Sequence, residues 1–177
     1  MDREWVVEES VTVAAPAEEV YAAVADPRRT REWSPEVFAT WVRGRGRTIG
    51  PGTRFVGFNR LGWRVWFTTC RVTSAVPGAA FAFRVSSFGI PVAVWGYRVE
   101  AIEQADETQG PQTRLTEYWE DLRRGTRGAA FVSWLGRVFT GVAPERRAAV
   151  NRANMRATLE RIRDALEKEH KVPDPRP

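Results

Sequence analysis

The sequence predicts an α+β domain in which seven antiparallel strands form a curved sheet that packs against a long C-terminal helix. Three observations support this fold class. Residues 5–13 alternate apolar and polar side chains, as a half-buried strand does, and two short helical segments follow them. Residues 37–122 consist of strand-like runs separated by short Gly- and Pro-containing breaks, which favour hairpins. From Pro144 onward, apolar residues recur at helical spacing.

Local sequence patterns predict the first strand and the starts of the two short helices. The alternation in residues 5–13 places valines on one face of a strand. Pro16 suits the first position of a helix, and the acidic residues after it suit the positive end of the helix dipole. Asp26 followed by Pro27 is a second start signal, so we expect another short helix that ends before Pro35.

The six later strands are separated by breaks such as Pro77-Gly78 and Gly89-Ile90-Pro91. Arg64 and Arg71 differ in parity, so one regular strand cannot expose both side chains without a bulge. We expect Trp66, Thr68, Cys70 and Val72 to face inward and Arg64 to lie near the strand end. The predicted strands are Val37–Val42, Thr53–Leu61, Trp63–Val76, Ala80–Ser86, Val92–Glu103 and Thr113–Leu122.

The C-terminal helix is predicted to run for roughly 25 residues, or about 37 Å. Pro144 opens it, and arginines and glutamates occupy its other face. We expect one domain over residues 1–170 and a flexible, proline-rich tail over residues 171–177. The apolar stripe consists of Ala148, Met155, Leu159, Ile162 and Leu166.

Composition excludes several classes of function. The 177 residues contain one cysteine, Cys70, and one histidine, His170, so a disulfide framework, a thiolate metal cluster and a Ser-His-Asp triad are not expected. We expect neither a metal nor another cofactor. No apolar run reaches the length of a membrane span, and the acidic start differs from a signal peptide. We therefore expect a cytoplasmic protein.

Charge is unevenly distributed along the chain. The net charge is +5, yet residues 37–99 contain nine arginines and no acidic residue. Such basic clusters bind phosphate, nucleic acid or anionic lipid. No nucleic-acid-binding motif accompanies the arginines, so nucleic acid is not an expected partner.

Charged residues also indicate which face of each strand is turned inward. Because Arg114 belongs in solvent, the alternate residues Glu117 and Trp119 face the inside of the curve, and Arg98 directs Tyr97 inward by the same rule. The inward residues are mostly aromatic with a few polar groups, which is typical of a small-molecule pocket and also of an ordinary core. They include Phe55, Asn59, Trp66, Thr68, Phe83, Trp95, Tyr97, Glu117 and Trp119.

Several stretches of the chain match one known superfamily. The opening SVTVAAPAEEVYAAVADP, the segments EWSP and GTRF, and the strands VPGAAFAFRV, WGYRVEAIE and TRLTEYWED resemble the START-like (SRPBCC) superfamily, in its bacterial polyketide cyclase/dehydrase-like branch. The resemblance covers about residues 5–168 and implies the helix-grip fold, with an apolar cavity between the sheet and the last helix. Its members include lipid carriers, hormone receptors, aromatic-ring cyclases and co-chaperone domains, so fold alone does not determine function.

The resemblance favours binding of a small hydrophobic or aromatic molecule, lipid or polyketide-like, in that cavity. The alternatives are a cofactor-independent cyclase/dehydratase in which Glu117 and Tyr97 are catalytic, and a co-chaperone-like interaction module. The sequence does not decide whether the protein is an enzyme. The expected ligand-binding residues are Trp33, Phe55, Asn59, Trp66, Thr68, Phe83, Trp95, Tyr97, Glu117, Trp119 and Met155.

Two features leave alternatives open. An inward Glu117 in an apolar cavity would have a raised pKa and act as a general acid or base, anchor a ligand, or form a structural ion pair. The apolar segment 129–142 is a lid over the cavity, a plug of the core, or a surface that contacts a partner or a membrane, since arginines flank it.

Overall fold

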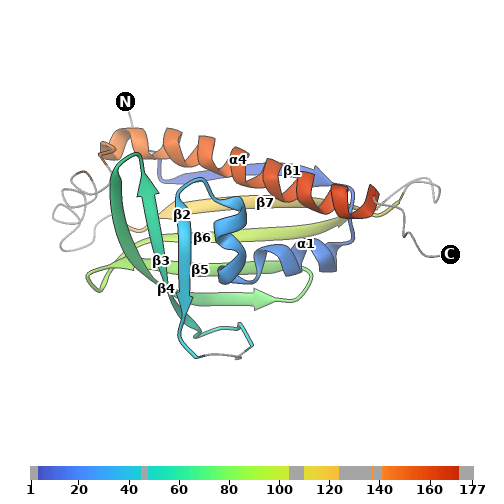
Figure 1. The fold of residues 1–177 in the computed structure, drawn as a ribbon, viewed down its shortest axis with the longest axis horizontal. Coiled ribbons are helices and arrows are strands. Elements are labelled where there is room, and N and C mark those ends of the chain that lie inside the picture. The colour runs from blue at the N-terminus through green and yellow to red at the C-terminus, as the bar shows by residue number, and fades with distance from the viewer. Residues whose placement is uncertain (1–3, 45–47, 104–109, 124–136, 138–140, 172–177) are drawn as a thin grey trace.

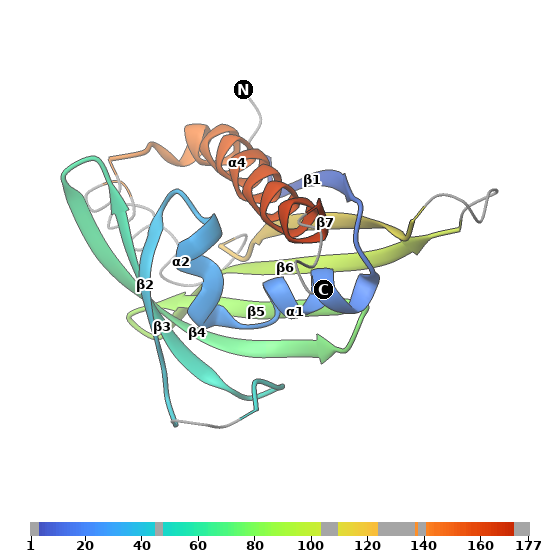
Figure 2. The same cartoon turned by 45° about the vertical axis from the view of Figure 1, so that its right-hand side comes forward.

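The computed structural model describes residues 4–44, 48–103, 110–123, 137 and 141–171. Seven antiparallel strands form one sheet in the order β1-β7-β6-β5-β4-β3-β2. The helices lie on one side of this sheet, and α4 crosses it diagonally above β1 and β7 (Figures 1 and 2). The predicted α+β architecture, with a long C-terminal helix and two short helices after the first strand, is confirmed.

Each predicted strand is present, with ends that differ by at most two residues. The sheet is a meander from β2 to β7, and β1 pairs with β7 as the edge strand beside it. Ile90 and Pro91 belong to a strand, whereas the sequence placed them in a break, because Pro91 pairs with Ser86 beside a bulge. The strands are β1 Val6–Val13, β2 Val37–Val42, β3 Arg54–Leu61, β4 Arg64–Val76, β5 Ala80–Ser87, β6 Ile90–Ile102 and β7 Gln112–Asp121.

Strand β4 contains a bulge beyond Arg71, and the strand is regular between Arg64 and Arg71. The register against β5 shifts between Val72 and Ser74. Because the extra residue changes the alternation, Val72 before the shift and Ala75 after it both pack against the core. Arg71 is exposed on the outer face, while Arg64 is the first residue of the strand. The parity conflict between the two arginines is thus resolved by placing one of them at the strand end.

Two short helices follow β1. Helix α1 spans Ala17–Val24, and Pro16 is its N-cap rather than its first residue. The second start signal produces a 3-10 turn, η1 (Pro27–Arg29), that continues into α2 (Thr30–Trp33).

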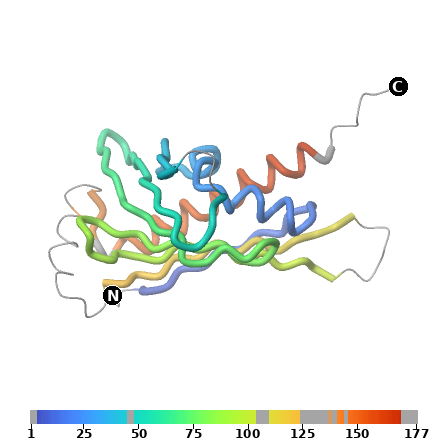
Figure 3. The backbone as a smooth tube through the Cα atoms, turned by 90° about the horizontal axis from the view of Figure 1, so that it is seen from below, coloured from blue at the N-terminus to red at the C-terminus, as the bar shows by residue number. Residues whose placement is uncertain are grey.

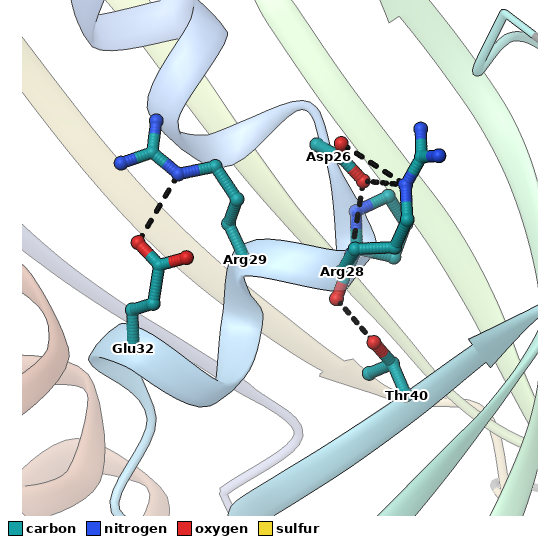
Figure 4. A network of polar contacts seen from close by, with 6 residues as sticks. Asp26, Arg28, Arg29, Glu32 and Thr40 are labelled. Carbon is teal, nitrogen blue, oxygen red and sulfur yellow. Dashed lines mark hydrogen bonds and ion pairs between the residues drawn. The ribbon is translucent and has the colours of Figure 1, made fainter. Parts of the chain in front are cut away.

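Polar contacts hold this second helical segment against the sheet (Figure 4). The Asp26 carboxylate caps η1 by accepting from the backbone N–H of Arg28 at 2.9 Å. The Thr40 hydroxyl of β2 donates to the Pro27 carbonyl at 2.9 Å. These bonds fix the position of α2 at one end of the sheet.

Helix α4 spans Pro144–Lys171 and lies along the concave face of the sheet (Figure 3). Its predicted apolar stripe is buried in full: Met155 and Ile162 are inaccessible to solvent, and Leu159 and Leu166 are nearly so. These residues pack against two apolar clusters, one around Phe81, Leu115 and Val20 and a smaller one around Trp119. Burial of this stripe holds the helix on the sheet.

Two predicted segments fall mainly outside the described residues. Of segment 129–142, the structure describes Arg137, Gly141 and Val142. Of the predicted tail, Lys171 belongs to α4, and residues 172–177 lie outside the described part.

Candidate functional site

A cavity of about 380 Å³ lies between the concave face of the sheet and helices α2 and α4. This volume is within the range of small-molecule sites. Six of the sheet strands, β2 to β7, contribute to its wall, and α4 contributes the opposite side. The sheet residues that line it include Phe55, Gly57, Asn59, Trp66, Thr68, Cys70, Phe83, Val85, Trp95, Tyr97, Glu117 and Trp119.

Strand register explains why these side chains converge. Residues that pair directly across neighbouring strands share a face. In the β3–β4 hairpin, Asn59 pairs with Trp66 and Phe55 with Cys70, and all four line the cavity. Alternate residues of the same strands are more exposed on the opposite face of the sheet.

Aromatic rings form much of the wall. The rings of Phe55 and Phe83 meet edge to face, with centroids 5.2 Å apart. Trp95 and Trp119 are direct cross-strand partners, so their indoles lie side by side on the inner face. Such preformed contacts present both ring faces and ring edges to a bound molecule.

Glu117 is the most unusual polar group in the cavity wall. Its carboxyl is buried, and its Oε1 accepts a hydrogen bond of 3.1 Å from the Tyr97 hydroxyl. Burial raises the pKa of Glu117 to about 8, although the hydrogen bond from Tyr97 partly opposes this shift. Burial, and then Glu117 itself, raises the pKa of Tyr97 well above its usual value. Both groups are therefore mainly protonated at neutral pH.

The second oxygen of Glu117, Oε2, is buried and has no hydrogen-bond partner among the described residues. An unsatisfied buried oxygen costs free energy, so it favours a ligand that can bond to it.

A neighbouring glutamate shows what Glu117 lacks. Glu9 of β1 pairs directly with Glu117 and therefore projects to the same side of the sheet. Arg156 contacts both Glu9 oxygens, at 3.0 and 3.1 Å, and Arg152 contacts Glu9 Oε1 at 3.1 Å. Both arginines extend from α4, and no such ion pair joins Glu117 to any residue that the structure describes.

A second polar cluster lies on the helical side of the cavity. Glu36, just after α2, accepts from Arg147 at 2.9 Å and from Asn154 at 3.0 Å. Arg147 and Asn154 lie two turns apart on α4, so both reach the same carboxylate. The remaining guanidinium nitrogen of Arg147, NH1, is buried without a hydrogen-bond partner in the described part of the chain. This nitrogen is a donor available to a ligand.

Sequence reasoning missed this cluster, because Glu36 is more than a hundred residues from both Arg147 and Asn154 along the chain. One signal was available: Glu36 is the last acidic residue before the acid-free stretch 37–99.

Arg123 also lines the cavity, in a buried ion pair. Its guanidinium contacts both oxygens of Asp121, at 2.8 and 2.7 Å. The sequence grouped Arg123 with the cations that flank segment 129–142, whereas the structure buries it at the end of β7.

Three smaller polar groups lie on the β3–β4 side. The Asn59 amide donates to the Gly57 carbonyl at 3.2 Å, and it is 3.5 Å from the Thr68 hydroxyl. Burial raises the pKa of the Cys70 thiol to about 12, so this thiol is not a nucleophile at neutral pH.

Trp33 does not line the cavity, unlike the other ten residues predicted to contact a ligand. Its indole N–H donates to the Ala23 carbonyl at 3.3 Å, and its own carbonyl accepts from Arg161 at 3.0 Å. Trp33 therefore anchors α2 to α1 and α4, which agrees with the inward packing of its side chain. Met155 reaches the cavity from α4.

Within the described residues, no three His, Cys, Asp or Glu side chains are grouped closely enough to hold a metal ion. In the same part of the chain, no helix combines the length and hydropathy needed to span a bilayer.

Comparison with solved structures supports the fold. A Polyketide_cyc-like protein from Corynebacterium glutamicum is 29% identical, with a TM-score of 0.62 and full coverage of both chains. The Zhui aromatase/cyclase from a Streptomyces species is 20% identical, with a TM-score of 0.61, and the match covers 94% of this chain and 96% of that one. The di-domain ARO/CYC protein BexL is 18% identical, with a TM-score of 0.60, over 96% of this chain and 48% of BexL.

A search of curated proteins found no match. A family model described as "Polyketide cyclase / dehydrase and lipid transport" matches residues 4–167, which include every strand and nearly all of α4. The chain therefore belongs to the polyketide cyclase/dehydrase and lipid transport family.

Proposed function

We propose that this protein binds a small hydrophobic or aromatic molecule, lipid or polyketide-like, in the cavity between the sheet and α4. The observation that carries the proposal is the cavity itself, about 380 Å³ in volume and lined by aromatic rings with a few separate polar groups. This combination is typical of sites that bury an apolar ligand and orient it with a few hydrogen bonds.

The two polar clusters suggest how such a ligand would be oriented. A protonated Glu117 can donate a hydrogen bond to a carbonyl or phenol oxygen, with Tyr97 holding the carboxyl in place. Arg147 offers its free nitrogen from the opposite wall. A flat molecule with oxygen atoms at two positions would satisfy both clusters while its body contacts Trp95 and Trp119.

Native mass spectrometry of the protein purified from its own host, followed by organic extraction, tests the proposal. We expect a hydrophobic adduct of one molecule per chain. The Trp66→Ala variant, which removes a cavity ring, should lose most of the adduct. Trp41→Ala is the matched control, because Trp41 is an exposed indole on the outer face. A bare mass, with no uptake from a panel of lipids and aromatic compounds, would contradict the proposal.

A second candidate function is a cofactor-independent cyclase or dehydratase. The observation that favours it is Glu117, a carboxyl with a pKa of about 8 beside a tyrosine hydroxyl. Catalytic acids and bases need pKa values near the working pH. In a dehydration, protonated Glu117 would donate its proton to the departing hydroxyl as the C–O bond breaks. The resulting carboxylate would then take the proton from the adjacent carbon, so that water leaves and the acid is restored.

Turnover separates the enzyme from the binding protein. Once a bound compound class is known, we expect Glu117→Gln to abolish turnover while keeping the ligand in the cavity. Tyr97→Phe should lower turnover less and shift the pH profile upward, because the Tyr97 hydrogen bond lowers the pKa of Glu117. Undiminished turnover in Glu117→Gln would exclude this carboxyl as the acid.

A further inference from the structure

The outer face of strands β2, β3 and β4 exposes an apolar surface that the cavity does not explain. Phe58 and Phe67 are direct cross-strand partners, and the Phe38 ring lies 6.4 Å from the Phe58 ring. Trp41 of β2 pairs with Val56 on the same face. Phe38, Trp41, Val65 and Phe67 are each about half exposed, at 47–58%. We call these outward residues, together with Phe58, the aromatic face.

Two hairpin turns extend this surface. Trp63, in the β3–β4 turn, is 84% exposed, and Phe88, in the β5–β6 turn, is 68% exposed. In a meander, alternate turns lie at the same end of the sheet, so both rings project from one end. Phe88 has a φ of 49°, in the left-handed region that costs a side-chain-bearing residue roughly 1 kcal/mol. Phe88 and Gly89 both have positive φ, as a two-residue hairpin turn requires, and this turn leaves the Phe88 ring exposed as part of the apolar surface.

Arginines lie beside the aromatic face. Arg71 of β4 pairs directly with Arg54 of β3 on one side and with Arg84 of β5 on the other. All three are exposed, and no ion pair joins any of them to a residue that the structure describes. We call them the arginine row. Like charges opposite each other destabilise a sheet, and residues 37–99 contain no acid that would offset them.

We propose that the aromatic face and the arginine row together dock the protein onto a membrane surface that contains anionic phospholipids. Trp and Phe side chains insert at the headgroup level, while arginines pair with lipid phosphates, and each basic residue near the surface adds to the affinity. The charge of the surface is complementary to such a bilayer, and no described residue of the chain pairs with the arginine row.

A bilayer fits better than a nucleic acid. Trp63 and Phe88 project from turns, and the aliphatic Val65 lies among the rings, so this surface offers no flat platform for stacked bases. The rings of Phe38 and Phe58 are tilted by 48°, which also disfavours a continuous stack.

The docking surface borders the cavity. Val65, Phe67 and Phe88 are among the residues at the cavity wall as well as on the exposed surface. These three residues lie at or near the β3–β4 and β5–β6 turns, so a bilayer bound at that end of the sheet would adjoin the cavity, and we place ligand entry and exit there. This last point rests on the proposed function, whereas the docking itself does not.

Vesicle flotation with the full chain tests the proposal. One vesicle set contains phosphatidylcholine alone, and the other contains equal parts of phosphatidylcholine and phosphatidylglycerol. We expect binding to the second set, weakened by salt, and little binding to the first. Replacing Arg54, Arg71 and Arg84 by Gln should lower the partition coefficient by about a hundredfold. The variant Trp63→Ser with Phe88→Gly should lower it by about tenfold, and the glycine also relieves the strained backbone.

A matched control removes the same charge elsewhere. Arg31, Arg114 and Lys168 are exposed, and replacing all three by Gln should leave binding nearly unchanged. If the two triple variants lost equal amounts of vesicle binding, net charge alone would explain the binding, and the proposal would be overturned. Undiminished flotation of the arginine-row variant, binding of single-stranded RNA in place of vesicles, or self-association through this face would also overturn it. Cavity occupancy is measured separately without vesicles, so failure of docking and failure of ligand binding are distinguishable.

Discussion

Two buried glutamates on opposite walls of one cavity have different surroundings. Glu36 is bonded to Arg147 and Asn154 of α4, so its negative charge is compensated. Among the described residues, Glu117 is bonded to the neutral Tyr97 alone, and burial raises the pKa of Glu117 to about 8. The comparison teaches that burial alone does not make a carboxyl reactive. What matters is whether a cation reaches it, because a paired carboxylate keeps its charge and an unpaired one takes up a proton.

Breaking the compensated site should have the largest effect on stability. Glu36→Ala leaves Arg147 largely buried and without its counter-ion, and we expect a loss of about 3 kcal/mol in the free energy of unfolding. Urea denaturation measures it. Glu32→Ala is the control, since Glu32 forms an exposed pair with Arg29 and its loss should cost less than about 1 kcal/mol. Equal losses in the two variants would show that Glu36 is no more structural than a surface residue.

Replacing Glu117, the carboxyl without a cationic partner, should increase stability instead of lowering it. Because the folded-state pKa of Glu117 is raised from 4.5 to about 8, the folded protein holds a proton that the unfolded chain releases between these values. Its contribution to stability is therefore full below pH 4.5 and is lost as the pH rises toward 8. Glu117→Gln should remove this dependence and stabilise the protein by about 2 kcal/mol at pH 8.

Thermal unfolding of wild type and Glu117→Gln across this pH range gives the difference curve. A constant difference, independent of pH, would mean that Glu117 is ionised throughout and would remove the basis of its proposed acid role.

Tyr97→Phe sharpens the comparison within the uncompensated site. The variant removes the hydroxyl that lowers the pKa of Glu117, so this pKa should rise further. Loss of one buried hydrogen bond should also cost about 1 kcal/mol of stability. Carboxyl titration by NMR or by difference infrared spectroscopy reports the shift. A downward shift would contradict the hydrogen bond between the two side chains.

Glu9→Gln should have the smallest effect of the four. Glu9 faces the same way as Glu117, but its arginine partners on α4 are substantially exposed, so solvent and salt already weaken the pairs. We expect a change in melting temperature smaller than in Glu36→Ala, Glu117→Gln or Tyr97→Phe, and smaller still in high salt. A large decrease in melting temperature that does not depend on salt would show that the ion pairs of Glu9 behave as buried ones.

Side-chain periodicity made much of the cavity predictable. Alternation in β3, β4, β6 and β7 put Asn59, Trp66, Tyr97 and Glu117 on one face, and all four line the cavity. Parity also predicted Arg64 near a strand end, and it is the first residue of β4. Their roles in binding or catalysis stay predictions, which the experiments above address.

Other parts of the site were not predictable in the same way. Trp33 ends a short helix, where no periodicity tells which neighbour its indole meets, and it packs in the core instead of the cavity. The charge of Arg123 predicted an exposed side chain. The structure buries it, because the ion pair with Asp121, two residues away, compensates the charge.

The sequence by itself determined the order of the elements, the inward face of each strand and the excess of arginine in the middle of the chain. These features are local, because each follows from the period of a strand or helix or from composition. Tertiary structure decided which charges meet. Folding brings α4 across the sheet, where its described arginines reach Glu36 and Glu9 but not Glu117. Strand pairing aligns Arg54, Arg71 and Arg84. Charges interact through space over a few ångströms, so their partners depend on contacts between segments that are distant in sequence.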